Sequence, residues 1–198
     1  MTEQQVFVLA DRALLGVVEQ IRDDQWALTV PEDMTHGRAG LTLREVINYH
    51  AYDEAWVPDT LAGKTIDEVG DAHDGDLLGD DPKASFARLV AVADGAVAGF
   101  TDLDRTVHLT YGDWPAREYL THITHFRGSR VYDLSRFLGL DPTLPPELIQ
   151  GLLWELEPRA EQWRSYHVIG EPVEMPADAS VQERWLTLIG RDPRPDPR

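Results

Sequence analysis

The sequence predicts an all-α protein, built as a four-helix bundle with an additional helical C-terminal segment. Apolar residues recur at three- and four-residue steps along four long segments, and capping or helix-breaking residues lie at their ends. The 198-residue chain shows no internal repeat and no linker that would divide it. We therefore expect one domain over residues 1–190, followed by a proline-rich, disordered tail over residues 191–198.

The first two helices have clear sequence signals. The first is expected from Thr2 to about Asp24. The second begins after Thr42, because Glu45 follows three residues later and completes a capping box. Pro58 is expected to kink or end this helix. The apolar stripe of the first helix comprises Val6, Leu9, Ala10, Ala13, Leu14, Val17 and Ile21.

An acidic, glycine-rich stretch from Ala62 to Pro82 separates these helices from the third. Its acids do not follow the EF-hand spacing, so we interpret it as a solvated loop with one helical turn at Ile66 to Val69. The third helix is expected from about Pro82 to Phe100. The segment from Thr106 to Gly112 alternates like a short strand or an extended connector.

The longest helix is expected within the stretch from Gly112 to Asp141. Pro115 fits its first turn, and Gly139 fits its end. Arg130 falls inside the apolar face, and His122 and Asp133 lie at its edge. A buried, unpaired guanidinium is costly, so this helix is expected to line a polar pocket or to carry an internal ion pair. The apolar face comprises Tyr119, Ile123, Phe126, Leu134 and Phe137.

Two further helical segments complete the chain. One is expected from Leu144 to Tyr166, with an interruption at Pro158, and the last runs from Val181 to Ile189.

Composition excludes several classes of function. The formal net charge of −17 and the pI near 4.6 argue against nucleic acid and against anionic membrane surfaces as partners. The absence of cysteine excludes disulfides and thiolate chemistry by the protein itself. With no signal peptide and no apolar run long enough for a bilayer, we expect a cytoplasmic protein.

Several separated motifs resemble those of a known family. They are TLREVINYH, WVPDTLAGKTIDEVGD with DGDLLGDDP, LDRTVHLTYGDWPAREY and VYDLSRFLGLD, and they span about Thr42 to Asp141. In this order they resemble the DinB-like metal-binding superfamily, in the branch similar to mycothiol-dependent maleylpyruvate isomerase. The resemblance implies a four-helix bundle with a divalent metal in its core, and a low-molecular-weight thiol that serves an isomerase or transferase.

The resemblance also locates the family's metal-ligand positions. They fall at Tyr49, Phe126 and Arg130, and His50 lies one residue past the first of them. None of these three side chains is an ordinary ligand for a divalent cation. An arginine there would place a positive charge where the metal's charge would be.

One hypothesis is a relocated zinc or nickel site formed by His50, Glu118 and His122. Glu118 and His122 lie four residues apart on one helix, a spacing that suits a shared ion, and Glu54 is an alternative third ligand. The other interpretation is that these residues are satisfied core or surface groups.

A second hypothesis is a core pocket for a small anionic ligand, lined by Tyr49, His50, Glu54, Phe126 and Arg130. Arg130 would bind a carboxylate in place of the cation. The alternative is internal, with Arg130 paired to Glu54 or Asp133.

A third hypothesis is a non-catalytic, metal-free binding or assembly protein on the same fold. Apolar helix faces left over after packing would then form a homodimer.

Overall fold

The computed structural model describes residues 1–35 and 38–194 and is mostly helical, with helices covering 58% of the chain and one two-stranded sheet. This confirms the predicted all-α class. None of the helices in the described ranges is both long and apolar enough to cross a membrane.

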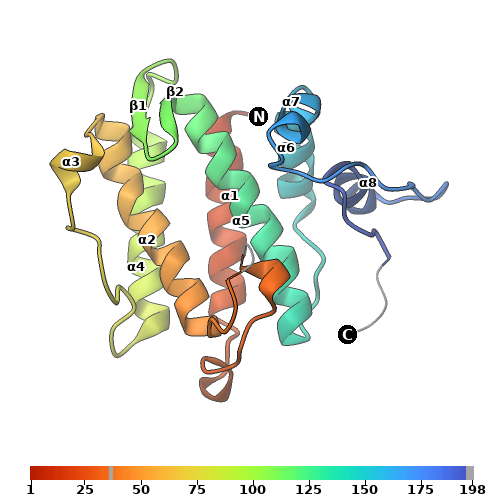
Figure 1. Ribbon diagram of the computed structural model, residues 1–198, viewed down its shortest axis with the longest axis horizontal. Helices are drawn as coiled ribbons and strands as arrows, with labels where there is room; N and C mark the ends of the chain where they lie inside the picture. The colour runs from red at the N-terminus through yellow and green to blue at the C-terminus, as the bar shows by residue number, and fades with distance from the viewer. Residues whose placement is uncertain (36–37, 195–198) are drawn as a thin grey trace.

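Four long helices lie side by side (Figure 1). They are α1 (Glu3–Val18), α2 (Leu43–Ala62), α4 (Pro82–Gly99) and α5 (Ala116–Leu138). Helix α1 packs against α4 and α5, and α2 packs against α4. Short helical turns η1 (Asp23–Gln25), η2 (Glu32–Met34) and α3 (Ile66–Val69) lie in the connections.

The C-terminal helices lie along one side of the long ones (Figure 1). They are α6 (Pro146–Leu156), α7 (Ala160–Ser165) and α8 (Val181–Leu188). Helix α6 contacts α1 and α5, and α8 contacts α6. The expected interruption near Pro158 is therefore confirmed as the break between α6 and α7.

Local capping explains where several helices begin. Thr42 accepts a hydrogen bond from the Glu45 backbone N–H, and the Glu45 carboxylate accepts one from the Thr42 N–H at 2.7 Å. The predicted capping box is thus confirmed. At the other end of α2, Gly63 adopts a left-handed conformation with φ of 80°, which glycine tolerates without steric cost.

Three predicted boundaries differ from the structure. Helix α1 ends at Val18 rather than near Asp24. Helix α2 does not end at Pro58 but continues to Ala62. We attribute this to burial of Val57 and Leu61, which outweighs the one backbone hydrogen bond that proline cannot donate.

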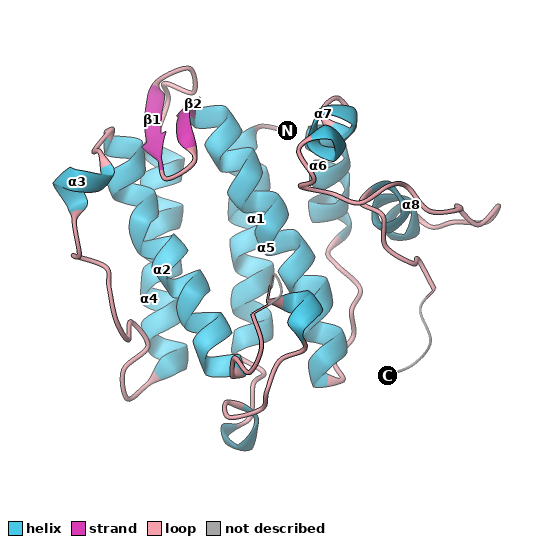
Figure 2. Ribbon diagram, viewed as in Figure 1, coloured by secondary structure: helices cyan, strands magenta, loops and turns pink. Residues whose placement is uncertain are grey.

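The third difference is the start of α5, which follows a β-hairpin (Figure 2), and the first strand of this hairpin confirms the short strand expected within Thr106 to Gly112. Strand β1 (Thr106–Leu109) pairs antiparallel with β2 (Gly112–Pro115). Pro115 consequently caps α5 rather than lying in its first turn. Gly112 allows the tight connection, because its φ of 123° is open mainly to glycine.

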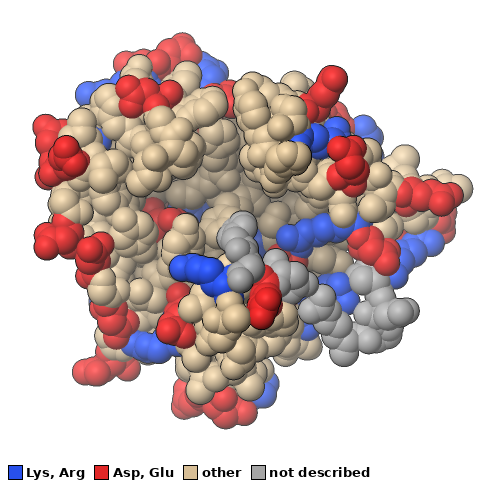
Figure 3. Space-filling model, in the orientation of Figure 1, with Lys and Arg blue, Asp and Glu red and all other residues tan. Residues whose placement is uncertain are grey.

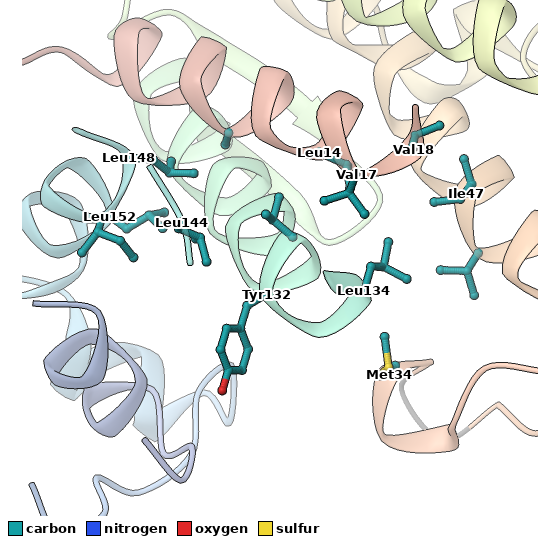
Figure 4. Packing of buried hydrophobic residues seen from close by; sticks show 14 of the residues in the cluster. Leu14, Val17, Val18, Met34, Ile47, Tyr132, Leu134, Leu144, Leu148 and Leu152 are labelled. Carbon is teal, nitrogen blue, oxygen red and sulfur yellow. The ribbon is translucent and has the colours of Figure 1, made fainter. Parts of the chain in front are cut away.

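The core joins the long helices to the C-terminal segment. Figure 4 shows Leu14 of α1, Leu134 of α5 and Leu148 of α6 among the packed side chains, and all three are fully buried. Burial of each such side chain contributes about 1.5–3 kcal/mol. This packing holds α1, α5 and α6 together.

Two glycines allow this close packing. A Cβ atom on Gly128 of α5 would lie 2.8 Å from Leu152 Cδ1, and one on Gly151 of α6 would lie 2.7 Å from Val6 Cγ1. Glycine therefore sets the separation of α6 from both α5 and α1.

The segment after residue 190 makes contacts in its described part. Arg191 forms an ion pair with Asp133 of α5, and Arg194 forms one with Asp178 at 2.8 Å. Residues 195–198 of the expected tail lie outside the described residues. The domain boundary at residue 190 stays a prediction.

Candidate functional site

Two adjoining cavities lie along one face of α5. The larger, of about 550 Å³, lies between α5, α7 and the segment after α7, and we call it the α5–α7 cavity. The smaller, of about 300 Å³, lies between α2, the hairpin and α5, and we call it the α2–hairpin cavity. Tyr111, His122 and Phe126 line both, so the two cavities share a wall.

The face that carries these cavities is hollowed (Figure 3). The hollow is bordered mainly by uncharged side chains, and many acidic side chains lie around the outer edge of the same view. This distribution agrees with the formal net charge of −17.

Helical periodicity places the polar groups of α5 in the α5–α7 cavity. Glu118, His122, Phe126, Arg130 and Asp133 recur at three- and four-residue steps, and all five line it. We expected Arg130, His122 and Asp133 on or beside one face of this helix, and all three line the α5–α7 cavity.

Arg130 connects α5 to α2 and to the loop before α2. Its side chain is nearly buried, with 6% exposed. Its Nε donates to His50 Nε2 at 3.1 Å, and its Nη1 donates to the Met34 carbonyl oxygen. His50 therefore accepts at Nε2, which is unprotonated. Burial lowers the pKa of Arg130. The nearby Asp133 carboxylate raises this pKa, and the positive charge of Arg191 lowers it.

Aromatic rings surround this contact. The His50 and Phe126 rings stack with centroids 4.8 Å apart, and the Arg130 guanidinium lies 5.4 Å from the Phe126 centroid. Tyr49 packs edge-on against Phe126 at 6.1 Å. Four of the five predicted pocket residues, Tyr49, His50, Phe126 and Arg130, therefore lie together.

The expected carboxylate partners of Arg130 are engaged elsewhere. Glu54 pairs with Arg127, with 2.7 Å between Oε1 and Nη2, and Asp133 pairs with Arg191. Within the described ranges, no carboxylate forms an ion pair with Arg130. The predicted ion pair between Arg130 and Glu54 or Asp133 is therefore wrong within the described residues. Glu54 also does not line either cavity.

A buried ion network involves residues that sequence reasoning missed. Arg127 Nε lies 2.7 Å from Asp11 Oδ1 of α1, and Arg127, Asp11 and Glu54 are all fully buried. Burial would lower the pKa of Arg127, but Asp11 and Glu54 outweigh it and raise that pKa. A signal was present, because Asp11 falls between the apolar residues Phe7 and Leu14 on one helical face.

The candidate metal ligands have other contacts. Glu118 Oε1 accepts from Arg159 Nη2 at 2.7 Å, and Arg159 lowers the pKa of Glu118 through this bond. His122 packs among Trp114 and Trp163, with centroids 5.3 and 5.7 Å away. His50 accepts from Arg130.

Among the described residues, no three histidines, cysteines, aspartates or glutamates are placed to hold an ion together, and the relocated metal site stays a prediction. At the positions implied by the family resemblance, Tyr49 and Phe126 present aromatic rings and Arg130 a cation.

Comparison of the chain with protein-family models, with curated proteins and with solved structures gives no match.

Proposed function

We propose that this chain is a maleylpyruvate isomerase-like protein with a DinB-like four-helix arrangement, whose α5–α7 cavity binds a small organic anion. The side-by-side packing of α1, α2, α4 and α5 supports the arrangement. One observation carries the ligand class. Arg130 is a nearly buried cation that lines a cavity of about 550 Å³ and has no carboxylate partner in the described ranges.

The guanidinium has one nitrogen for a ligand. Its Nε and Nη1 already donate to His50 and to Met34, whereas Nη2 donates no hydrogen bond to the described residues. Nη2 can donate to a carboxylate oxygen, and such charge-assisted hydrogen bonds are stronger than neutral ones. The protein contacts hold the guanidinium in place before the ligand arrives, which reduces the entropic cost of binding.

The rest of the cavity favours an unsaturated or planar body. Phe126, Trp114, Trp163 and Tyr166 line it, and aromatic faces pack well against flat ligands. The ligand that fits best is therefore a small carboxylate with a flat body, a class that includes unsaturated acids.

His122 gives the cavity a group for thiol-dependent isomerisation or transfer. Burial lowers the pKa of His122 more than the neighbouring Glu118 raises it. The ring is therefore mainly neutral at pH 7. A neutral imidazole in the cavity can accept the proton of a low-molecular-weight thiol. Arg130 takes the place of the family's cation, and it would hold the acid while the thiol is deprotonated.

Calorimetric titration with benzoate and fumarate tests this proposal, with benzamide as the neutral counterpart of benzoate. We expect benzoate to bind at least about tenfold more tightly than benzamide, because a hydrogen bond to a charged group contributes about 1.5–3 kcal/mol. Arg130→Met should weaken benzoate binding by about tenfold or more. Arg12→Met, which removes a surface charge with 70% of its side chain exposed, should leave it unchanged.

Arg130→Lys guards against a variant that does not fold. It keeps the charge but cannot reproduce the fork that contacts His50 and Met34. The proposal is overturned if wild-type protein binds neither acid, or if a folded Arg130→Met protein binds benzoate as wild type does.

A further inference from the structure

The α2–hairpin cavity differs in chemistry from its neighbour. Aromatic rings dominate its lining, and they come from α2, the hairpin and α5. The Tyr52 and Trp56 rings pack with centroids 5.9 Å apart on α2. The aromatic lining residues are Tyr49, Tyr52, Trp56, Tyr111, Tyr119 and Phe126.

Asp53 is the single aspartate or glutamate among the described lining residues, and neither lysine nor arginine lines this cavity there. Its neighbours along α2 have partners, since Glu54 pairs with Arg127 and Asp59 pairs with Lys64 at 2.7 Å. No ion pair or hydrogen bond joins the Asp53 carboxylate to the described residues, and the side chain is half-buried. A carboxylate therefore borders an aromatic cavity without a protein cation.

We propose that the α2–hairpin cavity is a binding subsite for an organic ammonium group, with Asp53 as its counter-ion and the aromatic rings as its walls. Ring faces attract cations through their quadrupole, and the attraction is larger where both groups are desolvated. When it is ionised, the Asp53 carboxylate adds a negative charge on one side of the same space.

The lining favours a methylated ammonium over a primary one. A primary ammonium has three N–H donors and needs an acceptor for each. The lining is rich in Tyr, Trp and Phe rings, and such rings suit N-methyl groups. The volume of about 300 Å³ leaves room for such a group.

The electrostatics of Asp53 support this assignment. Burial, and to a smaller extent Glu54, raises the pKa of Asp53, Arg127 and Arg130 lower it, and the net pKa is about 7. The carboxylate is thus only partly ionised at neutral pH, and a cation in the cavity would complete its ionisation.

The shared wall suggests what a larger ligand would carry. Because Tyr111, His122 and Phe126 line both cavities, one molecule could place a carboxylate at Arg130 and an ammonium at Asp53. This bridging ligand rests on the proposed function, whereas the ammonium subsite does not.

Calorimetric titration with choline tests the subsite, with 3,3-dimethylbutan-1-ol as its uncharged isostere of equal shape. We expect choline to bind at least about tenfold more tightly than the alcohol. Asp53→Asn should reduce choline affinity by about tenfold. Asp71→Asn removes the same charge from an exposed loop residue and should change the affinity by less than about twofold.

A second variant tests the aromatic wall. Trp56→Leu keeps an apolar side chain but removes a ring face, and it should weaken choline without affecting benzoate. The proposal is overturned if choline and the alcohol bind equally. It is also overturned if a folded Asp53→Asn protein binds choline as wild type does.

The two proposals fail separately. Arg130→Met removes a positive charge near the subsite and should preserve or strengthen choline binding. If benzoate does not bind but choline does so through Asp53, the proposed function falls and the ammonium subsite stands. If benzoate binds through Arg130 but choline does not bind, the ammonium subsite falls and the proposed function stands.

Discussion

Arg127 of α5 and Glu54 of α2 are in direct contact in the protein interior, with 2.7 Å between Nη2 and Oε1 and neither side chain exposed. Asp11 of α1 meets the same guanidinium at 2.7 Å. One arginine thus joins three of the long helices. A buried charge is tolerated only while it is paired, so this contact makes the helix arrangement sensitive to single substitutions.

Arg127→Met should destabilise the protein by about 3–5 kcal/mol, because it leaves the Asp11 and Glu54 carboxylates buried without a cation. Urea unfolding followed by circular dichroism measures this change. Arg22→Met is the control, since Arg22 and its partner Asp24 are 65% and 74% exposed, and it should cost less than about 1 kcal/mol. Equal losses for the two variants would contradict a central role for Arg127.

Gly128→Ala should destabilise the protein by about 1–3 kcal/mol, because the new methyl group would meet Leu152 at 2.8 Å. Gly95→Ala on α4 has open space around its Cβ position and should stabilise by about 0.5–1 kcal/mol. Thermal unfolding of both variants compares them directly. Stabilisation by Gly128→Ala would show that α6 can move away from α5 at little cost.

Asp53 should make stability depend on pH. Its pKa rises from 3.8 to about 7 on folding, so the folded state binds more protons between these values. The stability contributed by Asp53 is therefore fully present below about pH 4 and is lost as pH rises through 7. Relative to Asp53→Asn, wild-type protein should be more stable at pH 5 than at pH 8.

Urea unfolding at the two pH values measures this difference. Other ionisable groups lie in or behind the same cavity, so the comparison uses the variant rather than wild-type protein alone. The same offset between wild type and Asp53→Asn at both pH values would refute the shift. The surrounding groups are Tyr49, Glu54, His108, Tyr111, Tyr119, His122, Arg127 and Arg130.

Thr42→Ala should destabilise α2 by about 1 kcal/mol, because it removes the side-chain acceptor for the Glu45 N–H and the partner of the Glu45 carboxylate. Thr42→Ser retains the hydroxyl and should stay within about 0.5 kcal/mol of wild type. Chemical unfolding of the pair distinguishes loss of the cap from loss of the threonine methyl group.

Local signals predicted much of the fold. The start of α2 at Thr42 and Glu45 and the helical turn at Ile66–Val69 depend on residues within one turn of one another, and both are confirmed. Pro58 was expected to kink or end α2, and it does not end it, because the burial of Val57 depends on tertiary packing that local propensity does not include.

In the candidate site too, contacts within one helix could be predicted from the sequence and contacts between distant helices could not. Helical spacing was sufficient to place Arg130 and His122 on one face of α5, because both lie on the same element. The pairing of Arg127 with Asp11 joins α5 to α1, and no spacing rule relates residues so far apart in sequence. Trp163 was expected in a helix near the C-terminus, but its place in the cavity depends on how α7 packs.

The acidic side chains around the outer edge of the hollowed face have a kinetic consequence (Figure 3). A shell of like charge slows the diffusional encounter of an anion with the protein and speeds that of a cation. Added salt should therefore accelerate benzoate association and slow choline association, even though the two proposed sites share a wall.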